Sequence, residues 1–257
     1  MEKTAAFFDL DKTIIATSAS AALSRPFYDG GLVTRADVVR TAYAHLSYLL
    51  GSATEDSTER VRKQLSDLCQ GWDRDRVHRI VTQAVATQVS PHIYAEAKSL
   101  IAEHHELGHD VVIVSASGSD LVEPIAEKLG ADEVIATRME VKDGRYTGEI
   151  EFYAYGDNKA TAIEEIAAKN GYSLESSYAY TDSITDLPML RTVGHGFVVN
   201  PDRELRTKAV EEGWGVLNFT QTDSSKSRLE SNEAKALGAV GIVTLAWLVW
   251  RLARSSK

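Results

Sequence analysis

Two aspartates one residue apart follow an apolar run near the start of the chain. The run Ala5–Phe8 is typical of a short buried strand, and Asp9 and Asp11 come directly after it. Because side chains alternate along a strand, the two carboxylates should point the same way at its carboxyl end. Open α/β sheets bind their ligands at that edge.

Two carboxylates this close together require compensation. Either the pKa of one of them is raised, or a hard cation such as Mg²⁺, which prefers oxygen ligands, neutralises them. Such a pair can also divide the work of catalysis, because one carboxylate can attack as a nucleophile while the other serves as acid and then as base. The structural alternative is a solvated turn in which an aspartate caps the strand end.

A serine and a lysine later in the chain suit a phosphate group. Ser115 ends the apolar run 110–115, and its hydroxyl, with the amides of the turn that follows, can donate to a phosphate oxygen. A serine at this position also commonly caps a helix. Lys159 stands just before a predicted helix, and its compact charge suits a phosphoryl oxygen.

Two further aspartates are spaced four residues apart. Asp182 ends a predicted strand, and Asp186 stands at the start of a helix that has Pro188 in its first turn. Acidic residues there can complete a Mg²⁺ shell that Asp9 begins, directly or through water. Asp186 can also cap its helix, with or without that role.

The elements that must bring these residues together alternate along the chain from Pro91 onward. Strands are predicted at 110–115, 178–181 and 197–199, helices at 94–106, 121–129 and 160–170, and a hairpin with an Asp-Gly turn within 134–152. Short strands that alternate with helices imply a parallel, doubly wound sheet in an α/β protein.

Residues 16–90 interrupt this pattern after the first strand. Their apolar residues recur at spacings of three and four, and no convincing strand is visible. We expect an insert of four or five helices that covers the catalytic edge as a cap.

The C-terminal part of the chain has a different composition. Residues 220–235 are polar and rich in serine, which predicts a linker. The next fifteen residues are uncharged and end in Trp247 and Trp250, as at a membrane interface. They would extend about 22 Å as a helix, short of the roughly 30 Å hydrocarbon core. We therefore expect an apolar helix at 236–253 that spans or shallowly enters a membrane, and a helix docked on the globular body is the alternative.

The composition excludes several classes of function. A net charge of −9 argues against nucleic acid as the main partner, since phosphate backbones are bound by basic faces. Cys69 is the only cysteine, so no internal disulfide and no cysteine-based zinc site can form. Because the first strand begins almost at once, we expect no signal segment before it. We expect a cytoplasmic catalytic domain tethered to the cytoplasmic membrane, and the oligomeric state is left open.

The order of these motifs resembles the haloacid dehalogenase superfamily. Its four motifs are Asp-x-Asp-x-Thr, a serine, a lysine and Asp-x-x-x-Asp, which this chain carries at 9–13, 115, 159 and 182–186. The form Phe-Asp-Leu-Asp-Lys-Thr-Ile-Ile looks like that of subfamily IB, the phosphoserine-phosphatase-like branch. The hairpin region and the ending at 199–219 also resemble that branch, so the resemblance spans about residues 4–219.

The resemblance implies a Rossmann-like catalytic core made of residues 1–15 and 91–219, with 16–90 as the cap. It also implies a phosphomonoesterase that uses Mg²⁺. Asp9 would form an aspartyl-phosphate, and Asp11 would protonate the leaving oxygen and then activate water.

The same resemblance assigns the binding roles. Ser115 and Lys159 would hold the phosphoryl oxygens. Mg²⁺ would be bound by Asp9, the backbone carbonyl of Asp11, and Asp182. Asp186 would lie behind these ligands and would not bind the ion directly.

The chain departs from phosphoserine phosphatases where those enzymes recognise their substrate. Ser18 stands nine residues after the nucleophile, where they have a glutamate for the substrate's amino group. The second motif reads Ser-Ala-Ser at 115–117 instead of Ser-Gly-Gly. The arginine that meets the substrate carboxylate has no certain counterpart among Arg60, Arg62 and Lys63.

Phosphoserine is therefore one candidate substrate among several. Histidinol phosphate and a lysophospholipid phosphate are others, because loss of one polar partner weakens discrimination of a charged amino acid. Phosphoryl transfer to an acceptor other than water is an alternative reaction. A non-catalytic, membrane-tethered binding protein that retains a phosphate pocket is the alternative from a different class.

Overall fold

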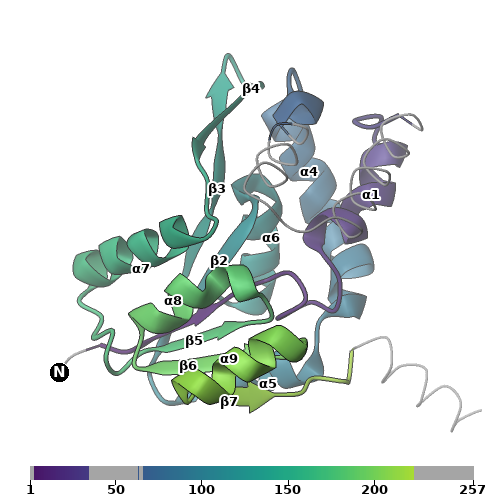
Figure 1. The fold of residues 1–257 in the computed structure, drawn as a ribbon. Helices are drawn as coiled ribbons and strands as arrows, with labels where there is room; N and C mark the ends of the chain where they lie inside the picture. The colour runs from purple at the N-terminus through teal and green to yellow at the C-terminus, as the bar shows by residue number, and fades with distance from the viewer. Residues whose placement is uncertain (1–2, 35–62, 64–65, 223–257) are drawn as a thin grey trace, which may run out of the picture.

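A seven-stranded sheet forms the centre of the described chain, which in this computed structural model comprises residues 3–34, 63 and 66–222 (Figure 1). The strand order is β4-β3-β2-β1-β5-β6-β7. The strands are β1 (Ala5–Phe8), β2 (Asp110–Gly118), β3 (Glu133–Lys142), β4 (Arg145–Phe152), β5 (Tyr178–Thr181), β6 (His195–Val199) and β7 (Gly215–Leu217). All neighbouring strands pair in parallel except β3 and β4, which form an antiparallel hairpin.

Helices cover both faces of this sheet. Figure 1 shows α7, α8 and α9 in front of it and α5 and α6 behind it. The helices are α1 (Ala19–Asp29), α4 (Arg74–Ala84), α5 (Ala95–Glu106), α6 (Ser119–Leu129), α7 (Asp157–Asn170), α8 (Leu187–Thr192) and α9 (Arg203–Glu212), with short π- and 3₁₀-helical turns at Val85–Val89, Ser90–His92 and Ile184–Asp186. The predicted parallel, doubly wound sheet is therefore confirmed.

The central strand β1 serves two hydrophobic cores at once. Ala6 and Phe8 pack in the core with α5 and α6, whereas Ala5 and Phe7 pack in the core with α7, α8 and α9. Each of these four residues is at most 1% exposed. A strand that is buried on both faces has a continuous apolar sequence, which is why this strand could be predicted from the sequence.

Between β1 and α5 the described chain is helical. It forms α1, α4 and the turns that lead to α5. Residues 35–62 and 64–65 lie outside the described part, so the division of the chain into a core and a cap at 16–90 stays a prediction.

The C-terminal predictions fall mostly outside the described residues. The apolar helix expected at 236–253 lies there, as does the linker beyond Thr222. Within the described ranges, no helix has the length and apolar character needed to cross a bilayer.

The connection between the insert and the sheet is bridged by the last described residues. Ile15 pairs with Ile93 where the chain leaves and re-enters the core, and Tyr94 pairs in turn with Thr222. The Ala95 amide donates to the carbonyl of Gln221 at 2.7 Å. Residues 220–222 therefore add a third segment to this crossing point.

Glu96 secures this segment. Its carboxylate accepts backbone N–H bonds from Thr220 at 2.9 Å and from Gln221 at 3.1 Å. Burial acts to raise the pKa of Glu96, but these N–H donors outweigh it and lower the pKa. The contact is therefore strongest when Glu96 is ionised.

We expect Glu96→Ala to lower the free energy of unfolding by about 1–3 kcal/mol at pH 7, because it removes a charged hydrogen-bond acceptor. Since the folded-state pKa is depressed, this contribution is present above the unfolded-state pKa and is lost as the pH falls. Urea unfolding at pH 7 and at pH 3.5 should show a smaller difference between wild type and variant at the lower pH. Glu103→Ala, at an exposed position on the same helix, is the matched control, and equal losses in the two variants would contradict the prediction.

A buried histidine lies in the core behind the sheet. His104 of α5 is buried, with its Nε2 at 2.8 Å from the Tyr180 hydroxyl and its Nδ1 at 2.9 Å from Nδ1 of His109. Two facing ring nitrogens can share only one proton, so a second proton has no place between them. Burial, then the neighbouring His109 and His105, lower the pKa of His104 to about 4.

This depressed pKa predicts acid sensitivity. The unfolded chain binds the proton near pH 6.5 and the folded chain only near pH 4, so stability falls as the pH drops through that window. The loss should approach about 3 kcal/mol. His104→Gln should weaken the pH dependence of urea unfolding between pH 7 and pH 4, whereas His78→Gln, on an exposed position of α4, should leave it unchanged. Parallel curves for wild type and His104→Gln would reject this explanation.

Candidate active site

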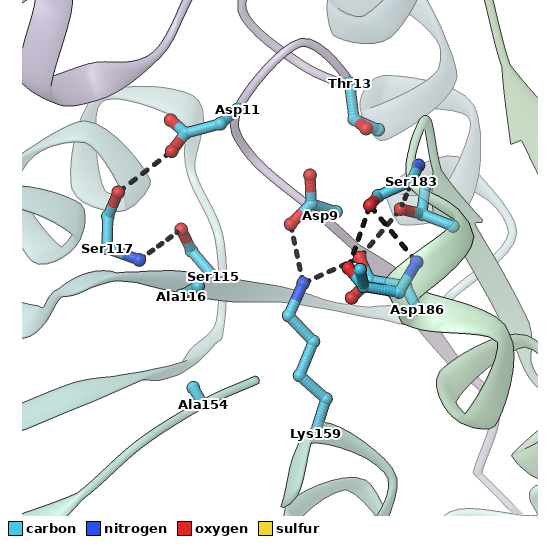
Figure 2. A network of polar contacts seen from close by, with 12 residues as sticks. Asp9, Asp11, Thr13, Ser115, Ala116, Ser117, Ala154, Lys159, Ser183 and Asp186 are labelled. Atoms are coloured by element: carbon cyan, nitrogen blue, oxygen red, sulfur yellow. Dashed lines mark hydrogen bonds and ion pairs between the residues drawn. The ribbon is translucent and has the colours of Figure 1, made fainter. Parts of the chain in front are cut away.

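The predicted acidic and basic residues meet at the carboxyl ends of the central strands. Asp9 follows β1 directly, and its backbone N–H donates to the carbonyl of Tyr180 at 2.9 Å. Figure 2 shows the Lys159 ammonium between two carboxylates, donating to Oδ1 of Asp9 at 2.7 Å and to Oδ2 of Asp186 at 2.8 Å. Lys159 is only 2% exposed. The structure therefore brings the first, third and fourth motifs together around one buried ammonium.

The charges of this cluster strongly perturb one another. Burial raises the pKa of Asp9 to about 8, with Asp186 and Asp182 adding to the rise and Lys159 opposing it. For Lys159, burial disfavours the ammonium, but Asp9 and Asp186 outweigh that effect and raise its pKa. Perturbed groups gathered at a ligand-binding edge are typical of a functional site.

Asp182 is held by a threonine of the first motif. Its backbone N–H donates to Oγ1 of Thr13 at 2.9 Å, and that hydroxyl lies 3.4 Å from Oδ1 of Asp182. Burial is the main cause that raises the pKa of Asp182 to about 6. Asp182 is therefore a third carboxylate that acts on Asp9, and the nearby Lys12 partly offsets the rise in the pKa of Asp182.

Asp11 has different surroundings. Its Oδ1 accepts the backbone N–H of Ala19 at 2.7 Å, and its Oδ2 accepts the hydroxyl of Ser117 at 2.9 Å. Burial raises the pKa of Asp11, and these two donors partly offset that rise. Figure 2 shows Asp11 beside the Ser115–Ser117 turn, separate from the Asp9–Lys159 contact. Sequence reasoning did not assign any role to Ser117.

Ser115 is buried at a bulge in β2. The pairing of β2 with β3 shifts register between Ser115 and Gly118, and the Ser115 hydroxyl accepts the N–H of Ser117 at 3.2 Å. The regular pairing of β2 with β3 is therefore interrupted at the predicted phosphate-binding serine. β2 continues to Gly118, three residues beyond the predicted strand at 110–115.

Thr137 ties this turn to the segment that precedes Lys159. Its hydroxyl donates to the carbonyl of Ala116 at 2.7 Å and accepts the N–H of Ala154 at 3.2 Å. Thr181 plays a comparable part by donating to Asp186 at 2.7 Å. Sequence reasoning missed both threonines, because a threonine in a strand is ordinary and carries no further signal.

Replacement of Thr137 by valine should loosen the attachment of both the Ser115–Ser117 turn and the segment that precedes Lys159. The variant keeps the shape of the side chain but leaves the Ala116 carbonyl and the Ala154 N–H unpaired, which costs about 1–3 kcal/mol. Urea unfolding should show this loss. Thr147→Val on the same hairpin, where the hydroxyl bonds to Glu140 in an exposed position, should cost less than about 0.5 kcal/mol. Similar losses in the two variants would argue against a special role for Thr137.

Comparison with known proteins identifies the class. The sequence profile of haloacid dehalogenase-like hydrolases matches residues 6–191. The chain therefore belongs to that family, and within it to the phosphoserine-phosphatase-like phosphatases.

Individual relatives agree with this placement. A probable phosphatase of Mycobacterium tuberculosis strain H37Rv is 52% identical over 247 residues, which cover 95% of this chain and 86% of that protein. A histidinol-phosphatase of Neisseria meningitidis serogroup C is 31% identical over 223 residues, covering 84% and 99% of the two chains. A substrate-bound phosphoserine phosphatase has the same fold, with a TM-score of 0.60 and 23% identity over 87% of this chain and 95% of that one.

Proposed function

We propose that this protein is a Mg²⁺-dependent hydrolase of small phosphate monoesters that forms an aspartyl-phosphate on Asp9. The observation that carries the proposal is the buried Lys159 ammonium, held at 2.7 Å from Asp9 and 2.8 Å from Asp186 at the carboxyl edge of the sheet. This arrangement supports a nucleophilic role for Asp9 next to a cation that would bind the phosphoryl group.

The donor set of the site fits Mg²⁺. Asp9, Asp182 and the backbone carbonyl of Asp11 would bind the ion. Asp186 would lie behind these ligands and would not bind the ion directly. Asp182 and Asp186 both raise the pKa of Asp9, and a divalent cation with oxygen ligands would relieve this repulsion between carboxylates. Among the described residues, no group of three or more His, Cys, Asp or Glu side chains lies close enough together to hold a metal ion by themselves. When bound, the ion would offset the charge of the transferring phosphoryl group.

The side chains of the site divide the remaining work. Lys159 lowers the pKa of Asp9 against the effect of burial, so it favours the ionised nucleophile. Lys159 and Ser115 would hold the phosphoryl oxygens. Asp11 would protonate the leaving oxygen and then take a proton from the water that releases phosphate.

The insert between β1 and α5 would act as the cap over this edge and help to select the substrate. At its start, the Ser18 hydroxyl accepts the N–H of Ala21 at 3.2 Å and so caps α1. A capping serine offers no carboxylate to an amino group, which weakens the case for phosphoserine. Histidinol phosphate is the second candidate substrate, favoured by the histidinol-phosphatase relative that this chain matches over 99% of that protein's length.

The catalytic assignment predicts that Asp9→Asn abolishes activity. Purified full-length protein should release p-nitrophenol from p-nitrophenyl phosphate with Mg²⁺ and not with a chelator, and Asp9→Asn should lower turnover by at least about 10³-fold, because it removes the nucleophile. Asp143→Asn is the matched control, since Asp143 is exposed in the hairpin turn with a φ of 52°, a conformation that asparagine also tolerates.

Turnover that survives Asp9→Asn would contradict the assignment of the nucleophile. The same assay with phosphoserine and histidinol phosphate, compared by kcat/KM, would rank the two candidate substrates. Added alcohols would reveal phosphoryl transfer if a new phosphate ester appeared among the products.

A further inference from the structure

The hydroxyl of Ser117 occupies a position with no counterpart in the motif of phosphoserine phosphatases. Those enzymes have Ser-Gly-Gly at this turn, whereas this chain has Ser-Ala-Ser at 115–117. The third residue therefore carries a side chain here. Its hydroxyl points at Asp11 and donates to Oδ2 at 2.9 Å, as Figure 2 shows.

The Asp11 carboxylate is held at both of its oxygens. Oδ2 accepts from Ser117 at the end of β2, and Oδ1 accepts from the N–H of Ala19 at 2.7 Å, in the first turn of α1. The two donors come from the sheet and from the insert. Together they fix the rotation of the carboxylate plane, which one donor alone would leave free.

The turn that carries Ser117 is itself fixed to the sheet. The Ser117 N–H donates to the Ser115 hydroxyl at 3.2 Å, and Thr137 of β3 holds the Ala116 carbonyl at 2.7 Å. Ser115 and Ser117 are two residues apart on one bulged strand end. The position of the Ser117 hydroxyl is therefore tied to that of the phosphate-facing serine.

We infer that Ser117 is a positioning residue that orients the Asp11 carboxylate toward the leaving oxygen of the substrate. This inference rests on the proposed function, in which Asp11 transfers that proton. Proton transfer is efficient only when donor and acceptor are held within hydrogen-bond reach and in line. Because Ser117 belongs to the sheet, it orients Asp11 relative to Ser115, independently of the insert.

The test uses full-length Ser117→Ala, Ser117→Gly and Ser117→Thr with Mg²⁺ and a series of aryl phosphates whose phenols differ in pKa. A poor leaving group needs the proton from Asp11, whereas p-nitrophenolate leaves largely without it. We expect Ser117→Ala and Ser117→Gly to lower kcat/KM for phenyl phosphate by about 10–100-fold and for p-nitrophenyl phosphate by much less. The dependence on leaving-group pKa should therefore become steeper, and Ser117→Thr, which keeps the hydroxyl, should restore the wild-type dependence.

A second measurement removes the partner. In an Asp11→Asn background, Ser117→Ala should cost little beyond the first change, because the group that it positions no longer transfers a proton. Ser119→Ala, at the start of α6, controls for the loss of a serine hydroxyl nearby and should leave the leaving-group dependence as in wild type.

Three outcomes would overturn the inference. An equal loss across all aryl phosphates would indicate a structural role, and a rise in KM for all of them with unchanged kcat would indicate a contact to the phosphoryl group. Full additivity with Asp11→Asn would indicate that Ser117 acts apart from Asp11. If the wild-type enzyme turns over and the variants give any of these results, only the role of Ser117 is rejected. If the wild-type enzyme turns over no monoester with Mg²⁺, the proposed function is rejected as well.

Discussion

The site depends on one buried cation. An ammonium taken out of water is strongly destabilised unless carboxylates surround it, and removal of one partner from such a pair leaves an uncompensated charge. Lys159 satisfies this requirement with Asp9 and Asp186, which come from the end of β1 and the start of α8. Because the buried ammonium loses one of its two carboxylate partners if either moves away, this contact holds three segments that are distant in the chain at one edge of the sheet.

Small hydroxyl groups complete what the charges begin. Thr181 donates to Asp186, Thr13 accepts the amide of Asp182, and Thr137 joins the Ser115 turn to the segment before Lys159. Each of the three threonines is buried, and each satisfies a backbone or carboxylate group. The charged residues are therefore held by neutral partners, which add no charge to a cluster already rich in carboxylates.

The sequence allowed the sheet and the charged residues to be predicted, because both follow periodic patterns. β1, β2 and β5 contain mostly buried apolar runs; Asp9 and Asp182 stand just after β1 and β5, and Ser115 ends the buried part of β2. The hydroxyl partners could not be predicted in this way. Thr137 is a common strand residue whose two bonds reach Ala116 and Ala154, and only the pairing of β3 beside β2 brings those atoms within reach.

The attachment of the last described residues illustrates the same limit. Nothing in the polar stretch after Phe219 indicates that it returns to Glu96 at the start of α5. The partner is a single half-buried carboxylate. A single residue forms no periodic pattern that could be detected in the sequence. Contacts between distant segments made by one side chain to backbone amides require the fold itself.

Two aspartates of one short motif thus occupy different environments. Asp9 faces an ammonium and further carboxylates, whereas Asp11 is held by a backbone amide and a hydroxyl. A full positive charge next to Asp9 favours its ionised form and opposes the rise in its pKa that burial causes, as the proposed nucleophile requires. Neutral donors at both oxygens of Asp11 orient it without a direct ion pair, as the proposed role in proton transfer requires. The sequence alone does not distinguish the roles of Asp9 and Asp11, because their side chains are identical. Their different neighbours in the fold support the proposed division of labour.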